Sequence, residues 1–439
     1  MKVLKFGGTS VGSAQRMKEV AKLITDGEQK IVVLSAMSGT TNTLVEISDY
    51  LYKKNPEGAN EIINKLESKY KQHVDELYAT QEYKQKGLEV IKSHFDYIRS
   101  YTKDLFTLFE EKVVLAQGEL ISTAMVNFYL QECGVKSVLL PALEFMRTDK
   151  NAEPDPVYIK DKLRAQLDLY PDTEIYITQG FICRNAYGEI DNLQRGGSDY
   201  TASLIGAAVN ASEIQIWTDI DGMHNNDPRI VDKTAPVRQL HFEEAAELAY
   251  FGAKILHPTC IQPAKYANIP VRLLNTMDPE APCTLISNDT EKGKIKAVAA
   301  KDNITAIKIK SSRMLLAHGF LRKVFEIFES YQTSIDMICT SEVGVSVTID
   351  NTKHLNEILD DLKKYGTVTV DKEMCIICVV GDLEWENVGF EAKALDAMRN
   401  IPVRMISFGG SNYNISFLIR ECDKKVALQS LSDMLFNGK

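Results

Sequence analysis

Short apolar runs alternate with longer polar and apolar stretches along the first two thirds of the chain. In the longer stretches the apolar residues recur every three or four positions, as on one face of a helix. This alternation predicts an α/β domain, a mainly parallel sheet with helices on both faces. Residues 44–130 carry few strand signals and are expected to form a helical elaboration. The strands are expected at 2–6, 30–36, 136–142, 174–182, 213–220 and 269–275.

After about residue 295 the rhythm becomes strand, helix, strand, strand, helix, strand, and it occurs twice. This is the pattern of a small ferredoxin-like α+β module. The repeat is also visible in the residue identities, because Gly319 and Met337 of the first copy match Gly389 and Met405 of the second. The strands are expected at 304–310, 335–340, 343–350 and 367–372, then at 374–380, 403–408 and 413–419. The helices are expected at 317–330, 353–364, 389–399 and 424–436.

The second pass lacks its last strand, whereas an unassigned apolar run at 295–300 precedes the first pass. We therefore expect two modules whose strands are interleaved rather than simply tandem. The predicted domains are 1–294, 295–372 and 373–439.

The composition is that of a soluble globular protein, with 439 residues, 44% hydrophobic residues and a net charge of −9. Lysine and arginine are scattered, which argues against a nucleic-acid surface and favours small molecules or other protein chains as partners. The pattern predicts neither a membrane span nor a signal peptide. We expect a cytoplasmic protein.

Eight cysteines lie far apart, as expected for reduced thiols. Cys375 and Cys378 have the spacing of a zinc or redox motif, but they lie in the strand-like stretch "EMCIICVVG". Residues three apart in a strand point to opposite faces and cannot share one metal ion. We expect a core strand there and no dedicated transition-metal site.

Five turns rich in glycine and polar residues follow expected strands or helices. Each alone is typical of an ordinary loop or helix cap. Open α/β sheets bind ligands at the carboxyl ends of their strands, so the five together indicate one phosphate-handling site. The first turn is not a P-loop, because Lys5 precedes the glycines instead of following them. The turns are "KFGGTS" at 5–10, "LSAMSGTTNTL" at 34–44, "LQRGGSDYTA" at 193–202, "WTDIDGMHNNDPR" at 217–229 and "FGAKILHP" at 251–258.

These motifs, with "AQGELIST" and "ITQGFI" between them, resemble in order the aspartate kinases of the amino-acid kinase family. The C-terminal repeat resembles the paired ACT modules of that family. The resemblance implies an αβα sandwich that transfers the γ-phosphoryl group of ATP to the side-chain carboxylate of L-aspartate. This is the first step toward lysine, threonine and methionine. No "GxGxxG" dinucleotide fingerprint occurs, so a fused homoserine dehydrogenase is not expected.

The implied reaction needs positive charge rather than a general base, because a carboxylate with a pKa of about 3.9 is already ionised at neutral pH. Lys5 and Lys254 then correspond to phosphate clamps, and Asp199 to the partner that holds Lys5 charged and aimed. Mg²⁺ is expected on the nucleotide, held by phosphate oxygens and water rather than by protein ligands.

The resemblance also assigns binding residues. Arg195 corresponds to the fork for the α-carboxylate of aspartate, and Glu119 to the partner of its α-ammonium. His224 stands where the family commonly has a tyrosine. Further positions that match substrate contacts are Thr41 and Ser198, and those that match ATP contacts are Lys5, Gly7, Gly8, Ser10, Thr218, Asp219, His224, Arg229 and Lys254.

The ACT-like repeat implies a homo-oligomer, a dimer through these modules, and inhibition by lysine or threonine. Two carboxylates, Asp336 and Glu342, suit an effector with a second ammonium and favour lysine. Against lysine, Leu316 and Ala317 stand where lysine-sensitive relatives tend to be polar. The alternative is a strand edge that only forms a dimer. The matching effector positions are Met314, Phe320, Leu321, Ile335, Asp336, Ser341 and Glu342.

Two rival functions stay open at this point. One is another carboxylate, carbamate or phosphate kinase of the same fold, against which "RGGSD" with Arg195 and the ACT-like repeat argue. The other is a catalytically silent amino-acid sensor, against which Lys5, Asp199 and Lys254 argue.

Overall fold

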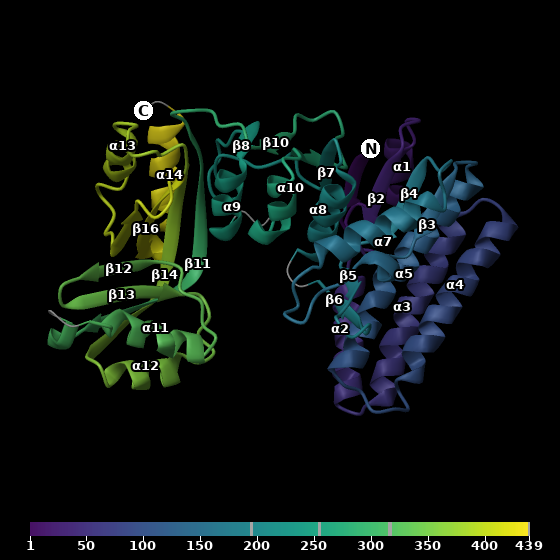
Figure 1. Ribbon diagram of the computed structural model, residues 1–439, viewed down its shortest axis with the longest axis horizontal. Coiled ribbons are helices and arrows are strands. Elements are labelled where there is room, and N and C mark those ends of the chain that lie inside the picture. Colours follow the sequence, from purple (N-terminus) through teal and green to yellow (C-terminus); the bar gives the residue numbers. More distant parts are fainter. Residues whose placement is uncertain (194–195, 253–255, 315–317, 438–439) are drawn as a thin grey trace. The chain divides into compact units, whose positions relative to one another are not determined.

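The chain folds into two units, shown in Figure 1 as a computed structural model. Unit 1 comprises Met1–Gly222 and Leu256–Asn288, and unit 2 comprises Met223–Ile255 and Asp289–Lys439. The structure describes residues 1–193, 196–252, 256–314 and 318–437. Unit 2 thus includes a segment from within the expected first domain.

The sheet of unit 1 has the strand order β3-β4-β2-β1-β7-β9-β10. The strands are parallel from β3 to β9, and β10 runs antiparallel to β9. All six strands expected before residue 295 are present, which confirms the α/β prediction. The strands are β1 Lys2–Phe6, β2 Lys30–Leu34, β3 Ser137–Leu140, β4 Ile175–Gln179, β7 Glu213–Thr218, β9 Val271–Asn275 and β10 Thr284–Ser287, with a small hairpin of β5 Ile182–Arg184 and β6 Ile190–Asn192.

Side chains along β1 alternate between the two faces of the sheet, and this decides which of them point toward α8. Leu4 and Phe6 pack into the large core formed with α1 (Ala14–Ile24) and α5 (Leu108–Glu132). Lys5 lies between them in the strand and therefore points to the opposite face. There α8 (Gly197–Val209) packs against β1 and β7.

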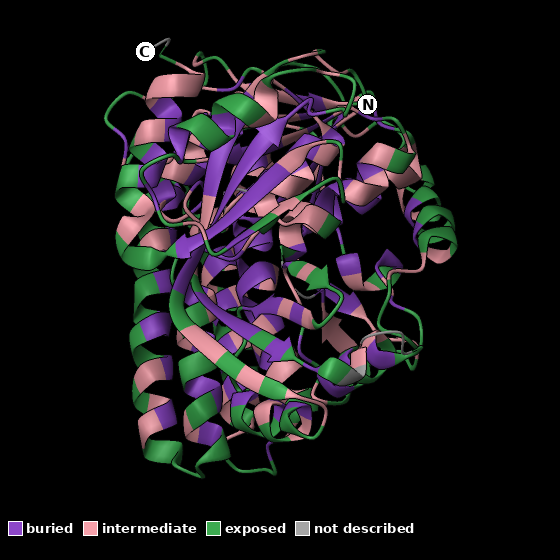
Figure 2. Ribbon diagram, turned by 90° about the vertical axis from the view of Figure 1, so that its left-hand side faces the viewer, coloured by how far each residue is buried: buried purple, intermediate pink, exposed green. Residues whose placement is uncertain are grey.

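The expected helical elaboration is confirmed as a layer of long helices that pack against one another, α2 Thr40–Tyr52, α3 Pro56–Leu77, α4 Gln81–Ser100 and α5. By length and hydropathy α5 resembles a membrane span, but 72% of its most apolar window is buried, as in a core helix. The strands β1, β2 and β4 are largely buried, whereas the long helices alternate buried and exposed positions along their length (Figure 2). The other helices of unit 1 are α6 Ala142–Phe145, α7 Pro156–Asp168, a 3₁₀ turn at Pro258–Ile261 and α10 Gln262–Tyr266.

Unit 2 contains one antiparallel sheet of six strands in the order β12-β13-β11-β14-β16-β15. The runs expected at 295–300 and 304–310 are two halves of the 16-residue strand β11, and 367–372 and 374–380 are halves of the 15-residue strand β14. The strands are β11 Ile295–Lys310, β12 Ile338–Ser341, β13 Gly344–Ile349, β14 Thr367–Gly381, β15 Met405–Phe408 and β16 Asn414–Arg420, and β8 is Gln239–His241.

The two modules therefore share both long strands. Module 1 consists of β12, β13, the second half of β11 and the first half of β14; module 2 consists of the other halves with β16 and β15. The second module obtains its missing strand from 295–300, as the interleaved arrangement predicted. Helices α11 Phe320–Ser330 and α12 Leu355–Lys363 cover module 1, α13 Phe390–Ala397 and α14 Lys424–Leu435 cover module 2, and α9 Phe242–Tyr250 packs against β11 and β14.

The expected core strand at "EMCIICVVG" is confirmed as the second half of β14. Cys375 packs in the same core as Ile377 and Val379, whereas Cys378, three positions on, is buried on the other face.

Candidate active site

The turns after β1 and β2 lie against each other in unit 1. The amide of Ser38 donates to the carbonyl oxygen of Gly8 at 3.0 Å. A Cβ at residue 8 would lie 2.8 Å from the carbonyl oxygen of Ala36, closer than real Cβ contacts allow. Gly8 is therefore required by the close approach of these two turns.

Lys5 and Asp199 form a salt bridge, with 2.7 Å between Nζ and Oδ1. Their side chains are only 12% and 14% exposed. Asp199 lies in the first turn of α8 but is not its N-cap, which is Gly196. A carboxylate in a first helical turn is stabilised by the helix dipole. The structure thus brings the predicted phosphate clamp and its predicted partner together.

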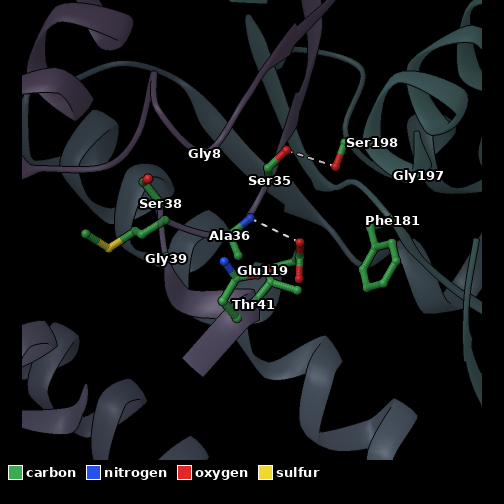
Figure 3. Close-up of a pocket in the computed structure, with 12 residues that line it drawn as sticks. Gly8, Ser35, Ala36, Ser38, Gly39, Thr41, Glu119, Phe181, Gly197 and Ser198 are labelled. Atoms are coloured by element: carbon green, nitrogen blue, oxygen red, sulfur yellow. Dashed lines mark hydrogen bonds between the residues drawn. The ribbon is translucent and has the colours of Figure 1, made fainter. Parts of the chain in front are cut away.

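A pocket of about 330 Å³ opens beside these turns in unit 1 (Figure 3). It is built from the end of β2, the start of α2, the middle of α5, the exit of β4 and the start of α8. Four residues predicted from the sequence line it: Gly8, Thr41, Glu119 and Ser198. The other lining residues are Ser35, Ala36, Met37, Ser38, Gly39, Asn42, Phe181 and Gly197.

Glu119 is the buried carboxylate of this pocket. Its Oε1 accepts a hydrogen bond from the Ala36 amide at 3.1 Å, as Figure 3 shows. Its Oε2 is buried and has no hydrogen-bond partner among the residues that the structure describes. Burial raises the pKa of Glu119 to about 7, against the weaker opposing effect of the Ala36 hydrogen bond. A cation that reached this oxygen would both satisfy it and favour its ionised form.

Two helix N-termini line the same pocket. Gly39 and Gly196 are the N-caps of α2 and α8, and neither supplies a side-chain hydrogen bond to the first amides of its helix. Residues of both first turns, among them Thr41 and Ser198, line the pocket. Uncapped amides and the helix dipoles favour anions. The pocket therefore combines one acid suited to a cation with two helix ends suited to anionic groups.

Sequence reasoning missed Phe181 and Ser35. The Ser35 hydroxyl donates to Ser198 Oγ at 2.9 Å, which joins the end of β2 to α8. A Cβ at Gly180 would lie 2.5 Å from Ser198 Oγ, so only glycine fits there. Phe181 then adopts a φ of +69°, and its ring lines the pocket. The glycine of "TQGF" was the available signal for this close approach.

The predicted nucleotide residues of unit 1 occupy varied surroundings. Ser10 is fully buried and its hydroxyl bonds Thr276 at 2.7 Å. The Thr218 hydroxyl, at the end of β7, accepts from the Ile220 amide at 3.1 Å. Asp219 follows it and is exposed. Gly7 precedes Gly8 in the turn after β1, where its amide donates to the Trp217 carbonyl at 3.4 Å.

Two further predicted nucleotide residues belong to unit 2. Arg229 is largely exposed and pairs with Asp227 at 2.7 Å. His224 Nδ1 lies 3.0 Å from the Thr234 hydroxyl. Arg195 and Lys254 lie outside the residues that the structure describes, so their predicted roles stay predictions.

Most of the predicted effector positions gather on module 1. Phe320 is in its core, and Met314, Leu321 and Ile335 pack against that core. Ser341 and Glu342 are exposed at the turn between β12 and β13. The Asp336 side chain is buried and bound by Lys301 at 2.7 Å.

Comparison with known proteins gives the class to which this fold and pocket belong. Residues 1–275 match the model of the amino acid kinase family, and residues 377–435 match an ACT domain. The chain is therefore an amino acid kinase with ACT modules.

Similarity to two relatives narrows this class to the aspartokinases. The chain is 36% identical to aspartokinase 1 (chloroplastic) of Arabidopsis thaliana, over 99% of this chain and 80% of the relative. Two structures of Escherichia coli aspartokinase III each cover 99% of this chain: the R-state in complex with aspartate and ADP (TM-score 0.86, 31% identity, 100% of that chain) and the T-state in complex with lysine and aspartate (TM-score 0.82, 32% identity, 99% of that chain). The chain belongs to the aspartokinase family and is an aspartate kinase.

Proposed function

We propose that the pocket at Glu119 holds L-aspartate while ATP transfers its γ-phosphoryl group to the aspartate side-chain carboxylate. The observation that carries this proposal is the buried, half-satisfied Glu119 between two uncapped helix N-termini. L-aspartate carries one ammonium and two carboxylates, and this pocket offers the complementary groups. The E. coli structure with aspartate and ADP supports the same pair of ligands.

Lys5 supplies the positive charge for the transfer. The acceptor carboxylate and the γ-phosphate are both anions, so the transition state gains most from a fixed cation. Asp199 holds the Lys5 ammonium at 2.7 Å and thereby fixes its direction. Arg195 and Lys254 remain the proposed fork for the α-carboxylate and the second clamp.

Mg²⁺ fits this arrangement as an ion carried by ATP. Within the described part of the chain, no three Asp, Glu, His or Cys side chains gather as a metal site. Asp199 is engaged by Lys5, and the orphan oxygen of Glu119 faces the amino-acid pocket. Phosphate oxygens and water are ligands that Mg²⁺ prefers. When bound, it would neutralise charge on the β- and γ-phosphates.

One assay tests the reaction. Purified protein is incubated with Mg-ATP and, in turn, L-aspartate, L-glutamate, N-acetylglutamate and carbamate, with hydroxylamine to trap acyl phosphates. Hydroxamate formed with aspartate alone is the expected result. Product with another acceptor would identify a different carboxylate or carbamate kinase, and no product with any acceptor would leave an amino-acid sensor.

We further propose that lysine is the effector, with threonine as the alternative, and that module 1 binds it. The buried Asp336 carboxylate suits an ammonium, and the T-state of the E. coli enzyme was solved with lysine. Titration of each amino acid against initial rate tests this, and flat curves for both would refute it. The proposed dimer through the ACT modules is tested by light scattering after gel filtration.

A further inference from the structure

Helix α9 reaches into module 1 through its last residue, Tyr250. The Tyr250 hydroxyl donates to Asp336 Oδ1 at 2.6 Å. Lys301 Nζ binds the same oxygen at 2.7 Å and also Asp350 at 3.0 Å. The same ammonium lies 4.2 Å from the centre of the Tyr250 ring. Tyr250, Lys301 and Asp336 therefore form one contact cluster, which we call the α9 clamp.

The two carboxylate oxygens of Asp336 differ in their hydrogen bonding within the α9 clamp. Its side chain has no exposed surface. Oδ1 is bound twice, whereas Oδ2 is buried without a hydrogen-bond partner among the described residues. A ligand ammonium that approached Asp336 would meet the like charge of Lys301 and would compete with the Tyr250 hydroxyl. Ligand binding at Asp336 and the α9 contact would then be coupled through one carboxylate.

Module 2 contains an equivalent ion pair at the matching positions of the repeat. The repeat that matches Met337 to Met405 places Arg404 at the position of Asp336. Asp371 occupies the position of Lys301, and the Arg404–Asp371 pair spans 2.8 Å with its charges reversed. This pair borders an open cleft of about 980 Å³. The paired charges thus belong to the repeat, and in module 1 the Tyr250 hydroxyl is added to them.

We propose that Tyr250 is a positioning residue through which α9 senses the effector at Asp336. The inference rests on the proposed effector site. An effector ammonium at Asp336 displaces the Tyr250 hydroxyl and releases the end of α9. The motif "FGAKILHP", which carries Lys254, begins at the next residue of the chain. Binding at module 1 is thereby passed to a segment that the sequence assigns to catalysis.

The test is Tyr250→Phe, which removes the competing hydroxyl and keeps the ring beneath Lys301. Without effector, kcat is expected to fall part of the way toward the lysine-inhibited value, because the variant already lacks the contact that the effector displaces. The half-inhibitory concentration of lysine, and its Kd by calorimetry, are expected to fall by about tenfold or more, as for loss of one hydrogen bond to a charged group. A merely structural role would lower the thermal midpoint without tightening lysine binding.

Tyr331→Phe is the matched control. The Tyr331 hydroxyl donates to Asp361 at 2.9 Å, between α11 and α12 of the same module. Its loss is expected to leave lysine inhibition unchanged. An equal response of the two variants, or unchanged or weakened lysine binding in Tyr250→Phe, would overturn the inference.

The variant Asp336→Asn distinguishes a failure of this inference from a failure of the proposed effector site. The effector site at Asp336, and the inference with it, would be refuted by either of two results. One is wild-type protein that neither lysine nor threonine inhibits, and the other is an Asp336→Asn variant that is inhibited like wild type. Inhibition that depends on Asp336 but not on Tyr250 would refute the inference alone.

Discussion

Two carboxylates of unit 1, Asp199 and Glu119, have opposite surroundings. Asp199 already has a cation, Lys5, at 2.7 Å. Among the described residues Glu119 has only the Ala36 amide as a hydrogen-bond partner, and burial raises its pKa to about 7. In the proposed function, the first carboxylate orients the ammonium of Lys5, whereas the second binds the ammonium of the substrate. The proposal thus assigns phosphoryl transfer and amino-acid recognition to separate acids.

The largest effect is expected from Lys5→Ala. Loss of the cation that we propose faces the transferred phosphoryl group should lower kcat about a thousandfold, with less than about a threefold change in the KM for aspartate. Lys2→Ala is the control, since Lys2 lies on the same strand and pairs with Glu28 at the surface. Steady-state kinetics measure both, and an unchanged kcat would remove Lys5 from the mechanism.

Asp199→Asn should lower kcat about a hundredfold, because Lys5 stays present but loses its fixed direction. The double variant Lys5→Ala/Asp199→Asn should be no slower than Lys5→Ala alone, since Asp199 acts through Lys5. Multiplicative losses in this double-mutant cycle would show instead that Asp199 has a role of its own.

Glu119→Gln should raise the KM for aspartate about thirtyfold while kcat changes only a fewfold. The amide keeps the size of the side chain but loses the charge that pairs with the α-ammonium. Glu111→Gln, on the exposed side of the same helix, should change neither value. A loss confined to kcat would contradict the assignment of Glu119 to substrate binding.

The smallest effect concerns pH. With a pKa of about 7, Glu119 in the free pocket is roughly one-tenth ionised at pH 6 and nine-tenths at pH 8. The substrate ammonium requires the ionised form, so kcat/KM for aspartate should fall about ninefold as the pH drops from 8 to 6. The Glu119→Gln profile should be flat over this range. A flat wild-type profile would contradict the raised pKa.

The sequence predicted the strands of unit 1 because each apolar run is bounded by turn residues. It also predicted that Lys5 and Asp199 meet, through the resemblance of their motifs. It could not place Ser35 or Phe181 in the pocket, because their position depends on how closely Gly180 approaches Ser198. That approach exists only once the sheet and α8 have packed.

Separate strands were expected in unit 2 where the structure has the two continuous strands β11 and β14. The expected strands were interrupted at the polar residues 301–303 and at Glu373. In the structure each stretch is an irregularity within a strand, with Asn303 and Glu373 at φ values of +60° and +55°. Polar residues are typical of both turns and β-bulges, and the two can be distinguished only from the strand with which the segment pairs. Likewise, the assignment of 223–255 to unit 2 depends on tertiary contacts that no local pattern encodes.

The shared strands set an order in which the regulatory half can assemble during synthesis. Ile295 pairs with Gly381, which is 86 residues later in the chain. At roughly 5–20 residues per second, the ribosome needs about 4 to 17 seconds to supply that partner. Module 1 has all its strands by then, while the first half of β11 still presents open backbone groups, the kind of edge that invites aggregation. Newly made chains are therefore most vulnerable in this interval, and substitutions in the first half of β11 should reduce the yield of folded protein more than those in its second half.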